Sequence, residues 1–99
     1  MKLRELAHSR AGDKGNTANL SLIAFRAEDY PLIREQVTAK KVQSWFAPLG
    51  VERVERYELT QLHALNFVLH QALGGGVTAS TALDTHGKSL SSYLLDMEV

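Results

Sequence analysis

The residues near the start of the chain that could bind an anion form a polar run containing two glycines. Residues 8–17 read HSRAGDKGNT, with basic, acidic and amide side chains around the glycines. Glycine lets backbone N–H groups approach an anion closely, and concave runs of such groups bind phosphate or carboxylate. We therefore predict an anion-binding loop whose ligand-binding residues are His8, Ser9, Arg10, Gly12, Asp13, Lys14, Gly15, Asn16 and Thr17.

The same run has a simpler interpretation, a polar connection between two strands that turns at residues 13–15. It is not a nucleotide-binding P-loop, because the GxxxxGK[ST] spacing is absent. Its length favours a ligand site, since the run 8–16 is longer than the roughly two to five residues of an ordinary hairpin loop. Both interpretations stay open from the sequence.

A second group of polar residues lies further along the chain, mainly on a segment expected to be helical. Asn66 and His70 are one helical turn apart there, and His63 lies near the same stripe. Histidines can bind a metal or move a proton, but His63 and His70 are two turns apart, and no HExxH pattern is present. The alternative is that these residues border the core and hydrogen-bond helix to sheet. The secondary site candidates are Asn19, His63, Asn66, His70, Gly74, Gly75 and Gly76.

The sequence indicates neither a nucleophile nor a metal centre, so we expect no cofactor and no metal. The absence of cysteine excludes disulfides, thiol catalysis and cysteine-bound metals. The serines near the C-terminus have no base partner nearby in the sequence. A self-sufficient enzyme would need acid–base groups that meet at one cleft, and the available groups are His8, Asp13, His63 and His70.

Composition favours one compact cytoplasmic domain. The chain has 99 residues, and its 11 lysines and arginines balance its 11 aspartates and glutamates. Binding to a nucleic-acid backbone usually needs a basic face, so we expect no nucleic-acid partner. No apolar run approaches the roughly 20 residues of a membrane span, and residues 1–6 are too charged for a signal peptide. A net charge of zero removes one barrier to self-association.

The hydrophobic patterns predict an α+β domain. Strands are expected at residues 3–7, 17–25, 51–59 and 77–83, and residues 28–47 should form two short helices or one kinked helix, with Thr38 as a good N-cap. The clearest helix is expected at residues 61–73, because its leucines fall within one arc of about 100°. Three glycines would stop this helix, and the tail 89–99 fits either a helix or a closing strand.

Three segments carry a family resemblance: residues 6–20 (LAHSRAGDKGNTANL), 57–76 (YELTQLHALNFVLHQALGGG) and 83–99 (LDTHGKSLSSYLLDMEV). Together they resemble the small ferredoxin-like domain of the acyclic terpene utilization AtuA-like family, and the similarity extends over residues 3–99. The most specific parts are the first run with the following Asn19, and the segment with Leu65, Asn66 and Phe67 that leads into the glycines.

The resemblance implies a fold, although the expected element order departs from a strict βαββαβ order. Residues 1–99 should form a single AtuA-like domain, a two-layer α+β sandwich of ferredoxin-like type. Its mixed sheet should have about four strands, with helices on one face.

The resemblance also implies a role but no catalytic mechanism. In the family the domain usually ends a longer protein, whereas here Met1 directly precedes the first expected strand. We therefore expect an accessory subunit that partners an AtuA-like large protein in acyl-CoA-linked catabolism of acyclic terpenes or branched acids. The alternative is a stand-alone, homo-oligomeric module that binds a CoA ester or a carboxylate.

Overall fold

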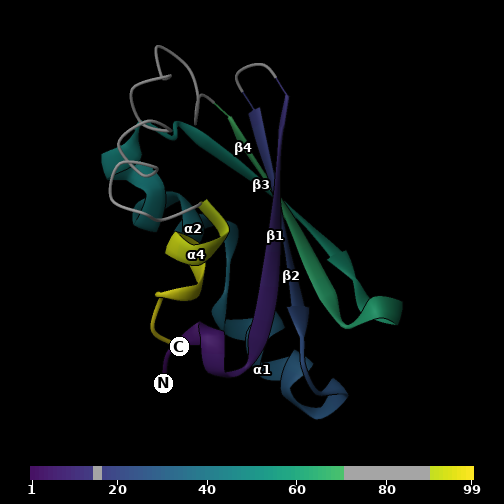
Figure 1. Cartoon of the computed structure of the whole chain (residues 1–99). Helices are drawn as coiled ribbons and strands as arrows, with labels where there is room; N and C mark the ends of the chain where they lie inside the picture. The colour runs from purple at the N-terminus through teal and green to yellow at the C-terminus, as the bar shows by residue number, and fades with distance from the viewer. Residues whose placement is uncertain (15–16, 71–89) are drawn as a thin grey trace.

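The computed structural model describes residues 1–14, 17–70 and 90–99, and these form a four-stranded sheet with helices on one side (Figure 1). The strands are β1 (Ala7–Lys14), β2 (Thr17–Ala24), β3 (Arg53–Leu59) and β4 (Ala64–His70). The α-helices are α1 (Tyr30–Gln36), α2 (Ala39–Phe46) and α4 (Leu90–Leu95). Short 3₁₀ helices are η1 (Leu3–Glu5), η2 (Ala27–Asp29), η3 (Ala47–Leu49) and η4 (Thr60–Leu62).

The sheet consists of two hairpins placed side by side, in the strand order β1-β2-β4-β3. All three strand pairs are antiparallel, so β2 and β3 run in the same direction with β4 between them. The segment containing α1 and α2 joins β2 to β3, which makes a split βαβ unit. The α+β class, the four strands and the helices on one face are as expected, whereas the expected sheet was mixed and all pairs among the described strands are antiparallel.

The core contains alternate residues of the two central strands, β2 and β4. Every second residue of β2 and β4 is buried, because successive side chains of a strand point to opposite faces. These residues pack against the apolar sides of the three helices. The fully buried members of this core include Ala18, Leu20, Leu22, Leu65, Phe67 and Leu69 from the sheet and Ile33, Val42, Phe46 and Leu94 from the helices.

The two short helices expected before residue 48 are confirmed. The first ends at Gln36, and Thr38 caps the second, because its hydroxyl accepts a hydrogen bond from the backbone N–H of Lys41. Trp45 of α2 donates its ring N–H to the carbonyl of Tyr93, whose hydroxyl donates to the carbonyl of Trp45 in return. These two hydrogen bonds hold α2 against α4 on the helix-covered face of the sheet.

The helix predicted at residues 61–73 is wrong, because this segment contains η4 and the central strand β4. Its leucine spacing fits a helical arc, but Leu65, Phe67 and Leu69 also alternate with period two and are all buried. The backbone of β4 bonds to β2 on one side and to β3 on the other, and these long-range pairs outweigh the local periodicity. Residues 71–73 lie outside the described part of the chain.

The first polar run is also a strand rather than a loop. β1 extends to Lys14 and pairs with β2 as far as Lys14 opposite Thr17, so only residues 15–16 connect the two strands. Two-residue connections are common in β-hairpins, and the length argument for a ligand loop therefore fails.

The chain ends differ partly from expectation. The strand expected at residues 3–7 is replaced by η1, because Leu3 and Leu6, three residues apart, are both buried. The tail combines both expected forms, since α4 is followed by a bridge between Lys2 and Glu98. The expected strand 77–83 lies outside the described residues. The two chain ends lie side by side (Figure 1), with Val99 N–H donating to Met1 O at 2.9 Å.

Candidate functional site

The side of the sheet opposite the helices, here called the open face, carries side chains from all four strands. None of the described helices packs on it (Figure 1). Strand register arranges its residues in four rows that cross the sheet. The row that we call the charged row consists of Lys14, Thr17, His70 and Arg53. The second row consists of Gly12, Asn19, Val68 and Glu55, and the third of Arg10, Ser21, Asn66 and Tyr57. The row that we call the apolar row consists of His8, Ile23, Ala64 and Leu59.

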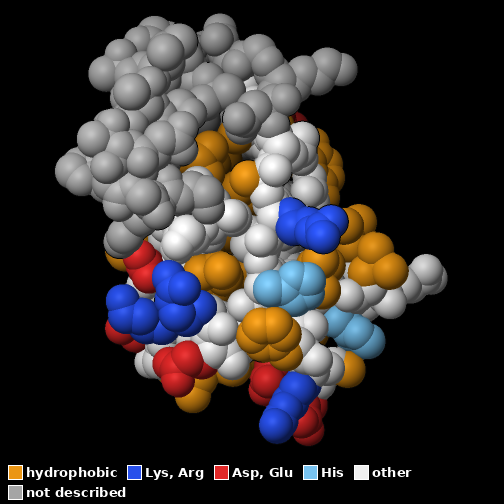
Figure 2. Space-filling model, in the orientation of Figure 1, with side chains coloured by type: hydrophobic (Ala, Val, Ile, Leu, Met, Phe, Trp, Pro, Cys, Tyr) orange, Lys and Arg blue, Asp and Glu red, His pale blue; other side chains and the backbone are white. Residues whose placement is uncertain are grey.

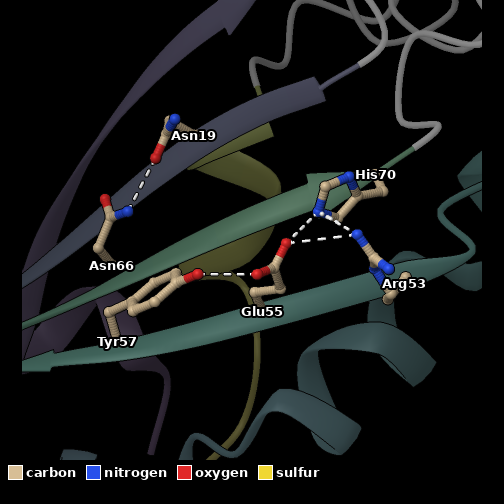
Figure 3. A network of polar contacts seen from close by, with 6 residues as sticks. All are labelled: Asn19, Arg53, Glu55, Tyr57, Asn66 and His70. Atoms are coloured by element: carbon tan, nitrogen blue, oxygen red, sulfur yellow. Dashed lines mark hydrogen bonds and ion pairs between the residues drawn. The ribbon is translucent and has the colours of Figure 1, made fainter.

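Glu55 is the centre of a polar network beside the charged row (Figure 3). The hydroxyl of Tyr57 donates to Glu55 Oε1 at 2.7 Å, and His70 Nε2 contacts Glu55 Oε2. Arg53 NH2 lies 3.5 Å from the same Oε2. Arg53, Glu55 and Tyr57 share a face because they occupy alternate positions of β3.

The network keeps Glu55 ionised. The hydrogen bond from Tyr57, followed by that from His70, holds the pKa of Glu55 below its ordinary value of 4.5. The same contact raises the pKa of Tyr57, because its hydroxyl proton is hydrogen-bonded to the Glu55 carboxylate.

The tautomer of His70 follows from its neighbours. Nε2 lies 3.1 Å from Arg53 NH2 as well as touching Glu55, and one nitrogen cannot accept from the first and donate to the second. A bond to an ionised carboxylate is the stronger of the two, so we assign the proton to Nε2, donating to Glu55. The second ring nitrogen, Nδ1, then points away from Glu55 (Figure 3).

A separate amide pair lies on the central strands. Asn66 Nδ2 on β4 donates to Asn19 Oδ1 on β2 at 2.8 Å (Figure 3). Asn66 and His70 share the open face, but four residues of extended chain place them about 13 Å apart. The amide pair and the Glu55 network are therefore two neighbouring sites.

The opposite end of the open face is apolar. Leu59 is 41% exposed there, and Phe25, just past the end of β2, is 60% exposed with the His8 ring stacked on it at 5.5 Å. Leu62 in the adjoining turn is also exposed and lines a shallow pocket with residues 58–61. Figure 2 shows hydrophobic and histidine side chains next to each other at the surface along β1 and toward the β3–β4 hairpin.

The strand geometry separates the residues of the predicted anion loop. By register His8, Arg10 and Gly12 take positions on the open face, whereas Ser9 points to the helix side, where its hydroxyl is buried without a hydrogen bond. The backbone of Asp13 and Lys14 belongs to β1, and Gly15 and Asn16 lie outside the described residues. The described part of the run before Gly15 is therefore extended strand backbone rather than a concave nest of backbone donors.

Two of the acid–base groups considered from the sequence, His63 and His70, lie at opposite ends of β4. His63 follows η4 with a left-handed backbone (φ 52°), and its ring lies edge-on to Tyr30. Seven residues of extended chain separate it from His70 by about 23 Å. Within the described ranges no group of three potential metal ligands comes together, and Gly74, Gly75 and Gly76 lie outside these ranges.

Of the secondary candidates, Asn19, Asn66 and His70 share the open face, although the helical reasoning that selected two of them was wrong. Arg53, Glu55 and Tyr57 were missed. Their signal was present, since they occupy alternate positions of the strand expected at residues 51–59.

Comparison with known protein families identifies the domain. A family model described as the AtuA ferredoxin-like domain covers residues 1–99. No curated protein and no solved structure matches the chain. The match confirms the family and the ferredoxin-like fold that the three sequence segments suggested. No described helix has the length and apolar character needed to cross a membrane.

Proposed function

The chain belongs to the AtuA ferredoxin-like domain family, and we propose that it acts as an accessory domain that docks on an AtuA-like large protein through the open face. The observation that carries this proposal is that no described helix covers the open face. Exposed apolar side chains such as Leu59 and Phe25, rimmed by polar residues, are typical of a partner surface. We place this role in cytoplasmic, acyl-CoA-linked catabolism of acyclic terpenes or branched acids, with residues 1–99 as one domain.

Charge favours a different protein over a second copy as the partner on this face. The whole chain has no net charge, but among the described side chains the open face carries Arg10 and Arg53 against one acid, Glu55. If two copies met face to face with aligned strands, the charged row would oppose either itself or the apolar row. Both arrangements are unfavourable, whereas a partner with an acidic group opposite Arg53 would be complementary.

A matched pair of leucines tests the docking proposal. Leu59 on the open face and Leu32 on α1 are 41% and 43% exposed, so a glutamate at either position should be tolerated by the fold. We expect Leu59→Glu to weaken binding to a purified AtuA-like large protein at least about ten-fold, or about 1.4 kcal/mol, and Leu32→Glu to leave it unchanged. Equal effects of both variants, or no binding by the unmodified chain, would contradict the proposal.

The alternative function, a stand-alone homo-oligomeric module for a CoA ester or a carboxylate, is favoured by the charged row, which suits an anionic ligand. It predicts a defined oligomer in light scattering of the pure chain, formed through a surface other than the open face. Leu59→Glu should leave that oligomer intact, whereas a monomer would remove this alternative.

A further inference from the structure

The charged row contains residue types that commonly bind anions, one on each of the four strands. Lys14 on β1 is paired with Thr17 on β2, Thr17 with His70 on β4, and His70 with Arg53 on β3. Neighbouring strands are about 4.8 Å apart, so the side chains of His70 and Arg53 are within reach of one phosphate-sized group. The row collects residues from positions that are far apart in the sequence.

The row carries more positive than negative charge. Arg53 is a fixed cation, and protonation of His70 would place a second cation beside it, with Arg53 NH2 only 3.1 Å from Nε2. Glu55 offsets one of these charges from the neighbouring row. Glu52, whose backbone N–H donates to the carbonyl of His70, occupies a position of the opposite face and does not add an acid here.

The donors that remain point away from Glu55. Because Glu55 takes the proton of Nε2, Nδ1 is the nitrogen of His70 that can donate to another group when it is protonated (Figure 3). Among the described residues, none hydrogen-bonds to Nδ1 of His70 or to Nε and NH1 of Arg53. The Arg53 side chain is 67% exposed, so its guanidinium is accessible to a ligand.

We propose that the charged row binds an anion, a phosphate or carboxylate group, between His70 and Arg53. Protonated His70 donates from Nδ1, Arg53 donates from its guanidinium, and Glu55 is a positioning residue that fixes the orientation of the His70 ring. The site goes beyond docking and needs no partner protein, so it can be tested on the isolated chain. Because the ligand binds the protonated form of His70 more tightly, binding weakens as the pH rises, and by linkage the ligand raises the pKa of His70.

Sulfate is the probe, because it stays a dianion across the range in which histidine titrates. The imidazoles of His8, His63 and His70 are titrated by NMR in sodium sulfate and in sodium chloride of equal ionic strength. We expect sulfate to raise the pKa of His70 by about half a unit or more and to leave His8 and His63 unchanged. The same shift at all three histidines, or none at His70, would overturn the proposal, since the ion would then be adventitious only.

Arg53 and Arg26 form a matched pair for the second measurement. Each is paired with a glutamate at 3.5 Å, and their side chains are 67% and 73% exposed, but Arg26 lies outside the charged row. Arg53→Gln should reduce the sulfate-induced shift of His70 by at least half, and Arg26→Gln should not. An equal reduction by Arg26→Gln would mean that only general surface charge attracts sulfate, which contradicts a site.

Two further titrations, with methyl phosphate and with acetate, identify the source of the anion. If methyl phosphate produces the same His70 shift as sulfate at millimolar concentration, the site takes a free phosphate group. If methyl phosphate has no effect but acetate does, and Arg53→Gln weakens binding of the AtuA-like protein, the anion is a carboxylate of the partner. Failure of the docking experiment with a retained sulfate shift would remove the proposed function and leave the anion site.

Discussion

The covered face and the open face of the sheet are built by the same strands, and neighbouring residues of β4 show how they differ. Phe67 is fully buried under the helices, whereas Asn66 and Val68 on either side of it are partly exposed on the open face. Burial of apolar surface accounts for the residues of the covered face. It gives no reason for the Arg53–Glu55–His70 network on the open face, and the anion site proposed above would supply one.

Truncation of adjacent residues on the two faces should give the largest difference in the free energy of unfolding. Phe67→Ala removes a fully buried ring and should lower the free energy of unfolding by about 3–5 kcal/mol, measured by urea denaturation. Val68→Ala, one residue away on the open face, should cost less than about 1 kcal/mol. Similar losses for both variants would show that the open face is also covered in the folded chain.

A double-mutant cycle measures whether the open face contributes to stability through its polar contacts. The hydrogen bond between Asn19 and Asn66 is exposed, so we expect a coupling energy of only about 0.5 kcal/mol between Asn19→Ala and Asn66→Ala. The control cycle combines Asn19→Ala with Val68→Ala, because Val68 is opposite Asn19 in the register but its side chain has no hydrogen-bonding group. A coupling above about 2 kcal/mol in the first cycle would make the open face a structural element like the covered one.

The smallest effect should come from the acid titration of Glu55. Its pKa is lowered in the folded chain, so its contribution to stability is present above the ordinary value of 4.5 and is lost as the pH falls through the lowered folded pKa. Tyr57→Phe removes the hydrogen bond that contributes most to the lowered pKa of Glu55, so this pKa should rise. NMR of the Glu55 carboxyl carbon measures the change. The raised pKa of Tyr57 has the opposite dependence, so its contribution is present below the ordinary value of 10.0 and is lost at higher pH. An unchanged pKa of Glu55 in Tyr57→Phe would show that the Tyr57 hydrogen bond does not lower this pKa.

Much of the covered side was predictable from local sequence. The alternation of β2, the proline-started helix α1 and the Thr38 cap are signals that operate within a few residues. β4 was not predictable in this way, because its leucines fit both periodicities and only its pairing with two distant strands decides between them. β1 was misread because it is an edge strand, where charged residues and glycine are tolerated.

The candidate site was predictable only in its parts. His70, Asn66 and Asn19 were selected from the sequence, but their neighbours depend on strand register. Register places Arg53 beside His70 across a gap of seventeen positions, and no local pattern specifies that pairing. Arg53 and Glu55 alone resemble an ordinary solvated strand face.

The meeting of the two chain ends has a consequence for how the domain can be connected. Backbone hydrogen bonds join Leu3 to Met97 and Val99 to Met1, on the helix side of the sheet (Figure 1). A polypeptide attached before residue 1 and one attached after residue 99 would leave from the same corner. The domain is thus suited to insertion into a loop of another protein, or to circular permutation with a short linker between its ends and new termini opened within Thr60–Leu62. In the first arrangement the host chain joins the domain away from the open face.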